Sequence, residues 1–126
     1  MSQTHLLAVG LGVVALVLLI PGPARAADRY VEASAPYDPF NDCSSPVQPC
    51  GSIVNATINA ASGDVIQVGP GIYNEAVVVR KDLTIEGAGA DRATLQAGGQ
   101  AVGLQVSDGA TVTVRGMTVT GGTPGQ

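Results

Sequence analysis

Short apolar runs separated by Gly, Asp and Asn fill the second half of the chain, between residues 63 and 120. The runs lie at residues 65–68, 76–79, 83–85, 94–97, 104–106, 112–114 and 117–119. Runs of this length, bounded by turn residues, are typical of strands, and no helical spacing separates them. The pattern therefore predicts one strand after another.

One five-residue string in this region occurs twice. The sequence LTIEG at residues 83–87 recurs as VTVRG at residues 112–116, with the order apolar, Thr, apolar, charged, Gly in both. Such recurrence is typical of a repeating coil that stacks on its neighbours rather than of a single hairpin. We expect coils at residues 64–81 and 82–109, and an incomplete one from residue 110.

The alternation of side chains predicts how these coils align. Matching residues 64–71 to 82–89 as strings would bury Gln67, whereas a slip of one residue keeps Gln67 outside, because such a slip reverses the two faces of a strand. The slipped register pairs Ile66 with Leu83 and Val68 with Ile85. In the next coil we expect matching partners: Val112 beside Leu83, Val114 beside Ile85, and Arg115 beside Glu86.

A helix is predicted just before the first coil. Apolar residues with helical spacing lie between residues 53 and 61: Ile53, Val54, Thr57, Ile58 and Ala61. Ser52 is a suitable N-cap and Gly63 a suitable terminator. Because this helix has a single apolar face, the segment 52–63 is expected to close the open end of the coils.

The N-terminus has the features of a targeting segment. An almost unbroken apolar run at residues 6–20 is followed by Pro-Gly-Pro and by Ala24-Arg25-Ala26, which has small residues where signal peptidase reads them. We predict a signal peptide at residues 1–26, cleaved before Ala27, and a secreted or cell-surface protein. The alternative is a membrane anchor, although the run is shorter than the roughly 20 residues that a bilayer requires.

Charge and composition narrow the partners. The chain has 126 residues, which favours one domain, and its formal net charge is −4, or −5 once Arg25 leaves with the signal peptide. This balance argues against nucleic acid or an anionic membrane as a partner. Aromatic residues make up 3% of the chain, so small and β-branched side chains must form the interior.

Two cysteines, Cys43 and Cys50, lie in a turn-rich segment. In an exported protein we expect a disulfide between them, worth at most about 2–3 kcal/mol for so short a loop. Two free thiols are the alternative. A metal site is disfavoured because residues 27–126 contain no His. Residues 27–51 are thus interpreted as an entrance loop, with a short strand at residues 30–33.

Three stretches resemble a known family: GDVIQVGPGIYNE at 63–75, LTIEGAG at 83–89 and VTVRGMTVTGG at 112–122. They are similar to the opening of secreted pectin-lyase-like right-handed parallel β-helix proteins, and the preceding Cys loop and helix resemble the N-terminal cap of that family. The resemblance implies an all-β fold: a single-stranded right-handed parallel β-helix of about three coils, at 64–126, behind a capping helix. Lyases, pectin methylesterases and carbohydrate-binding surface proteins share this opening.

Candidate chemistry is sparse. Without a His in the mature chain, a Ser-His-Asp triad or a Cys-His pair cannot form. In the resembled family, calcium-binding carboxylates with an Arg or Lys base, or two Asp with an Arg, lie on central coils that are missing here. We therefore expect no cofactor, and calcium only if further coils exist. Asp64, Asp82 and Asp108 are interpreted as turn residues.

Three residues are candidate carbohydrate contacts. Arg80 and Lys81 form a basic pair that could grip an acidic sugar, and Tyr73 could stack on a sugar ring. A solvated basic pair and a packed coil corner are the respective alternatives.

Two function classes follow from the sequence. The first is a non-catalytic exported β-helix module for surface attachment or polysaccharide contact. The second is the N-terminal fragment of a polysaccharide lyase or pectin methylesterase that lacks its active-site coils. Because no apolar periodicity follows Val119, we expect truncated coils whose open C-terminal edge associates with another copy.

Overall fold

The computed structural model describes residues 26–97 and 102–121. The predicted signal peptide at residues 1–26 lies, apart from Ala26, outside these residues. The elements in chain order are β1 (Asp28–Val31), α2 (Ile53–Asn59), β2 (Val65–Val68), β3 (Gly71–Asn74), β4 (Val77–Val79), β5 (Leu83–Gly87), β6 (Ala93–Gln96), β7 (Leu104–Val106), β8 (Val112–Arg115) and β9 (Thr118–Thr120). The chain is thus rich in strands and has little helix.

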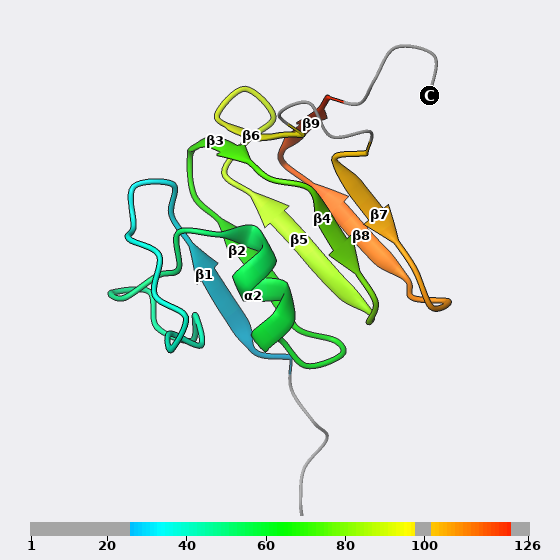
Figure 1. Ribbon diagram of the computed structural model, residues 1–126, viewed down its shortest axis with the longest axis horizontal. Coiled ribbons are helices and arrows are strands. Elements are labelled where there is room, and N and C mark those ends of the chain that lie inside the picture. Colours follow the sequence, from blue (N-terminus) through cyan, green and yellow to red (C-terminus); the bar gives the residue numbers. More distant parts are fainter. Residues whose placement is uncertain (1–25, 98–101, 122–126) are drawn as a thin grey trace, which may run out of the picture.

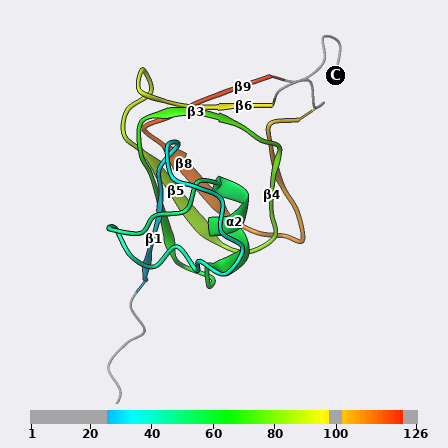
Figure 2. The same cartoon turned by 60° about the vertical axis from the view of Figure 1, so that its left-hand side comes forward.

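These strands form three parallel sheets, with the orders β1-β2-β5-β8, β3-β6-β9 and β4-β7 (Figure 1). The chain passes through the sheets in the same order each time, first as β2, β3 and β4, then as β5, β6 and β7, and then as β8 and β9. Figure 2 shows the sheets around a common interior, with α2 across one end. The boundaries of the passes agree with the predicted repeats at 64–81, 82–109 and from 110.

Alternate side chains of β2, β4, β5 and β6 fill this interior. Ile66 of β2, Leu83 and Ile85 of β5, and Leu95 of β6 are all at most 3% exposed. The residues between them, such as Gln67 and Glu86, are only partly buried. The core therefore has the aliphatic composition that the scarcity of aromatic residues predicted.

The register between β2 and β5 differs from the predicted one. Ile66 lies beside Ile85, and Val68 lies beside Gly87, two residues further along than expected. The predicted faces are nevertheless correct, because a shift of two residues returns every side chain to the same side of a strand. Side-chain alternation excludes a register error of one residue, but it cannot exclude an error of two residues. Between β5 and β8 the predicted pairs, including Leu83 with Val112, are confirmed.

Two strands were not anticipated in full. β3 was missed, and β1 begins at Asp28 rather than at Tyr30. β1 pairs with β2 in parallel, so the predicted entrance loop at 27–51 contributes the first strand of the largest sheet. The polar residues at the start of β1 do not show the alternation expected of a strand. Arg29, for example, is charged, yet its side chain is bonded to Asp64 within the fold.

The helix α2 is shorter than predicted, and only part of its predicted apolar face is buried. Ser52 is the N-cap, as predicted, and its Oγ accepts a hydrogen bond from Asn55 N at 3.2 Å. The helix ends at Asn59 with Ala60 as its C-cap, and Gly63, with φ of 93°, belongs to the following turn. Its buried residues are Ile53, Ala56 and Thr57, whereas Ile58 is 68% exposed, contrary to the prediction.

Candidate functional site: the disulfide loop and its hollow

The predicted disulfide between Cys43 and Cys50 is present, with the two Cα atoms 5.1 Å apart. Both cysteines are buried. The bridge lies against β1, because Tyr30 N donates to Cys43 O at 2.7 Å and Cys50 N donates to Tyr30 O at 2.9 Å. The disulfide loop, residues 34–50, is thereby fixed to the first strand of the sheet.

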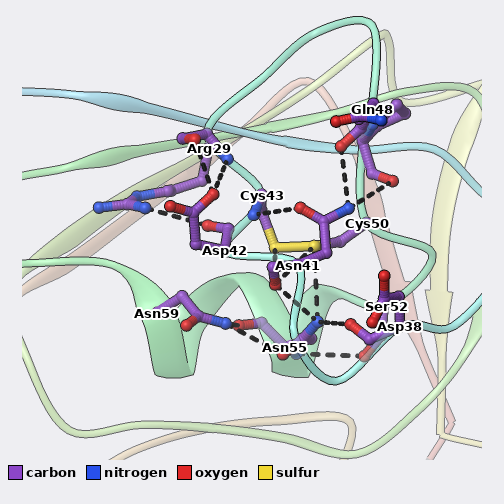
Figure 3. Close-up of a disulfide and its surroundings, with 12 residues drawn as sticks. Arg29, Asp38, Asn41, Asp42, Cys43, Gln48, Cys50, Ser52, Asn55 and Asn59 are labelled. Carbon is purple, nitrogen blue, oxygen red and sulfur yellow. Dashed lines mark hydrogen bonds between the residues drawn. A yellow bond between two sulfur atoms is a disulfide. The ribbon is translucent and has the colours of Figure 1, made fainter.

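Asn41 organises the interior of this loop (Figure 3). Its Nδ2 donates to Gln48 O at 2.9 Å, and its Oδ1 accepts from Cys43 N at 2.9 Å. The loop also contacts α2, since Asn55 Nδ2 donates to Asp38 O at 3.3 Å and to Asn41 O at 3.4 Å. These contacts join the loop, the bridge and the helix into one cap, although the loop contains no regular structure.

A hollow of about 720 Å³ lies over this loop. Its lining residues come from the end of β1 and from the loop: Glu32, Ser34, Ala35, Pro36, Asp38, Phe40, Asn41, Asp42, Val47, Gln48 and Pro49. Phe40 is 94% exposed and Val47 is 86% exposed. Backbone N–H of Phe40 donates to Asp38 Oδ1 at 2.9 Å, which fixes the turn that presents the ring. An aromatic face is thus held open to solvent beside hydrogen-bonding groups.

The hollow is electronegative. The acidic residues Asp38 and Asp42 line it, and no cationic side chain lines it in the described part of the chain. Hydrogen bonds from the Ser44 side chain and then from its backbone N–H lower the pKa of Asp42, so this group stays ionised. The nearest guanidinium, that of Arg29, is already bonded to the Asp42 carbonyl at 3.0 Å and to Asp64 at 3.3 Å.

The structure separates the three predicted carbohydrate contacts from this hollow. Tyr73 is 3% exposed, and its hydroxyl donates to Gly69 O at 2.8 Å, so its ring has no face free for a sugar. Burial and then the charge of Glu32 raise the pKa of Tyr73 to about 12. The packed corner, which was the alternative interpretation, describes this side chain.

Arg80 and Lys81 do not act together. Lys81 Nζ donates to Ala60 O at 2.6 Å and to Ile58 O at 3.3 Å, which satisfies carbonyls at the end of α2. Arg80 is exposed, and its Nη1 lies 3.7 Å from Asp108 Oδ2. Both residues line a smaller hollow of about 270 Å³ with Ile58. Their contact with an acidic sugar stays a prediction, and each of the two charges already has a partner within the fold.

Glu75 is a key residue that sequence reasoning missed. Its Oε1 accepts from Ser52 Oγ at 2.7 Å and from Val54 N at 3.1 Å, and its Oε2 accepts from Ile53 N at 2.8 Å. Glu75, which lies between β3 and β4, therefore caps the N-terminus of α2. A signal existed, because the first turn of α2 contains no acidic residue of its own.

Asp64 is the most deeply buried carboxylate of the described residues, at 4% exposure. It accepts from Ala61 N at 2.8 Å and from Ala27 N at 3.0 Å, and it pairs with Arg29. Burial opposes its ionisation, but the bonds from Ala61, Ala27 and Arg29 outweigh burial and lower its pKa. Asp64 therefore bonds to the start of β1 as well as to its own turn, whereas the sequence predicted only the turn.

Within the described ranges, no group of three or more His, Cys, Asp or Glu side chains is placed to hold a metal ion. In the same residues, no helix has the length and hydropathy to cross a membrane. Comparisons of the chain with protein family models, with curated proteins and with solved structures found no match.

Proposed function

We propose that this protein is an exported, non-catalytic right-handed parallel β-helix module of the pectin-lyase-like type, secreted or displayed on the cell surface. We further propose that it contacts polysaccharide through the hollow over the disulfide loop. The repeated passage through three parallel sheets supports the architecture, and the disulfide supports export. The observation that carries the binding proposal is the exposed ring of Phe40 over the hollow.

An exposed aromatic ring on a rigid support suits sugar binding. The ring offers an apolar face that a pyranose can cover, while carboxylate oxygens beside it accept hydrogen bonds from sugar hydroxyls. Phe40 supplies the ring, and Asp38 and Asp42 supply the oxygens. Because the disulfide and Asn41 already fix the loop, little ordering entropy is lost on binding.

The charge of the hollow selects the class of sugar. Carboxylates at Asp38 and Asp42 would face the carboxylates of a uronate polymer, and no cationic side chain lines the hollow in the described residues. The ligand is therefore a neutral polysaccharide, and pectate is disfavoured at this site. This differs from the acidic sugar that Arg80 and Lys81 suggested.

A binding assay with matched variants tests this site. Neutral glucans, mannans and galactans, with pectate as the charged competitor, would be compared by affinity electrophoresis. Covering a Phe side chain is worth about 1.5–3 kcal/mol, so Phe40→Ala should weaken binding by about 10- to 100-fold. Ile58→Ala removes an apolar side chain that is also exposed but lies on α2, and it should leave affinity unchanged. Equal binding by Phe40→Ala and the parent, or tighter binding of pectate, would contradict the proposal.

The absence of catalysis is tested separately. We expect the purified protein to release neither unsaturated uronates from pectate in calcium nor methanol from pectin. Release of either product above a no-protein control would refute this part of the proposal.

We also propose self-association through the edge formed by β8 and β9. In the described residues these strands pair on one side only, with β5 and β6, and Val112, Val114 and Met117 are only partly buried there. An unpaired parallel edge is a template for another chain. Light scattering should show a mass that rises with concentration, and a monodisperse monomer at high concentration would argue against this.

A further inference from the structure

Ala27 occupies a defined position at the start of β1. Its backbone nitrogen lies 3.0 Å from Asp64 Oδ1. Its carbonyl accepts a hydrogen bond from Val65 N at 2.9 Å, which holds the residue from the other side. The next residue, Asp28, is in register with Val65. The nitrogen of Ala27 is therefore aimed at a buried carboxylate by the pairing of the first two strands.

The predicted processing of the chain would change the charge of this nitrogen. Hydrolysis of the Ala26–Ala27 peptide bond adds one water molecule. The new carboxylate leaves on Ala26 with the signal peptide, and Ala27 keeps an amine, which is protonated near neutral pH. A neutral amide donor thereby becomes a cation at the same place.

We propose that Asp64 is a built-in receptor for the α-ammonium group that signal-peptide removal creates at Ala27. This inference rests on the export and cleavage included in the proposed function. The two oxygens of Asp64 are divided between its partners, with Oδ1 bonded to Ala27 and Oδ2 bonded to Ala61 and Arg29. The ammonium group thus has an oxygen of its own. Cleavage converts an ordinary hydrogen bond into a charge-assisted one.

The charged groups around the new terminus favour this pair. Asp64 is its direct partner, and Asp28, the next residue, accepts from Gln67 Nε2 at 3.3 Å. Arg29 is a like charge, but it is shared between Asp64 and the Asp42 carbonyl. On this proposal, the direct bond to the Asp64 carboxylate favours the protonated amine, so we expect its pKa to lie above the ordinary value of about 7.7–8.0.

The pair has a structural purpose as well. β1 carries the backbone bonds from Tyr30 to Cys43 and to Cys50. Fastening the first residue before β1 therefore also fastens the disulfide loop and its hollow. A raised amine pKa stabilises the fold below the pKa of the unfolded chain, and this contribution is lost as the pH rises through the folded pKa.

The test begins with the complete 126-residue chain, expressed for export. Mass spectrometry of the exported product identifies its first residue. The rate at which acetic anhydride acylates the α-amine, measured against pH by peptide mass spectrometry, then gives the amine pKa. We expect acylation at pH 7, below both pKa values, to be about tenfold slower than in the urea-unfolded protein, since a rise of one pKa unit lowers the deprotonated fraction about tenfold there.

Two variants separate this pair from general stability. Asp64→Asn should restore the ordinary acylation rate if it folds. Insertion of one Gly between Ala26 and Ala27 leaves Asp64 intact and moves the amine away from it. This second variant should show ordinary reactivity and, near neutral pH, a Tm lower by about 4–8 °C, which corresponds to about a fivefold change in the unfolding equilibrium. The difference in Tm should vanish at high pH.

The outcomes are distinguishable. A product that begins at Ala27 but whose amine reacts as in the unfolded chain and in the Gly-insertion variant would overturn this inference and leave export standing. A product that begins elsewhere would overturn the inference together with the proposed cleavage site. Slow acylation that requires both Asp64 and the native start would establish the pair.

Discussion

Replacing Glu75 with Gln should loosen α2 from the first pass of strands. The Glu75 carboxylate accepts hydrogen bonds from two backbone N–H groups of the helix and from Ser52 Oγ. Gln keeps the size of the side chain but replaces one acceptor oxygen with an NH₂ group that faces a donor. The variant therefore removes the charge and leaves one helix N–H without a partner, while packing stays nearly the same.

The expected cost can be worked from these contacts. A hydrogen bond to a charged group contributes about 1.5–3 kcal/mol, and three such bonds to one carboxylate are not additive. Glu75 is only partly buried, so solvent screens part of this energy, and Gln retains one acceptor. We expect a loss of about 2–3 kcal/mol in the free energy of unfolding, or a Tm lower by roughly 10 °C or more.

Urea and thermal unfolding, followed by circular dichroism, would measure this loss. Glu86→Gln is the matched control, because Glu86 accepts from Arg115 Nε at 2.7 Å in a pair that is largely exposed. Exposed pairs contribute about 0–1 kcal/mol. If Glu75→Gln cost no more than Glu86→Gln, the assignment of Glu75 as the cap of α2 would be refuted.

Three further predictions follow from burial and charge. Leu83→Asp should abolish cooperative unfolding, whereas Thr84→Asp on the outer face should leave a measurable transition, and the reverse result would invert the faces of β5. Burial and the charge of Glu32 raise the pKa of Tyr73 to about 12, so its neutral form stabilises the fold. This contribution should be lost as the pH rises from about 10 to about 12. In Tyr73→Phe, the last step in tyrosinate absorbance should disappear. Hydrogen bonds to Asp64 lower its pKa despite burial. Its contribution to the stability of the fold should therefore be complete above about pH 4 and lost as the pH falls through the folded pKa. A plot of Tm against pH should be flatter in acid for Asp64→Asn than for the parent.

The strands and their faces could be predicted from sequence because burial imposes a two-residue period. Leu83, Ile85, Val112 and Val114 occupy the predicted register on that basis. The register of β2 could not be fixed in this way, since shifts of two residues satisfy the same period. Choosing between them requires knowledge of how the connecting turns pack, which no alternation of side chains expresses.

The candidate site was less predictable than the fold. The disulfide followed from two cysteines and the expected compartment, but the roles of Tyr73 and Lys81 depend on partners from other segments. Tyr73 bonds to the Gly69 carbonyl, and Lys81 bonds to carbonyls at the end of α2. Phe40 was overlooked because it lies among Pro and Asp, where sequence patterns indicate only a loop.

The connections between sheets differ in length, yet the strands that they join stay in register. Only Glu75 and Ala76 separate β3 from β4, whereas the equivalent connection in the next pass runs from Gln96 to Leu104. Parallel pairing is preserved on both sides of the longer connection. The connection between these two strands can therefore differ in length without a change in strand pairing. Changes in the length of this connection, such as an added affinity tag, should therefore leave the parallel pairing of β3 with β6 and of β4 with β7 intact.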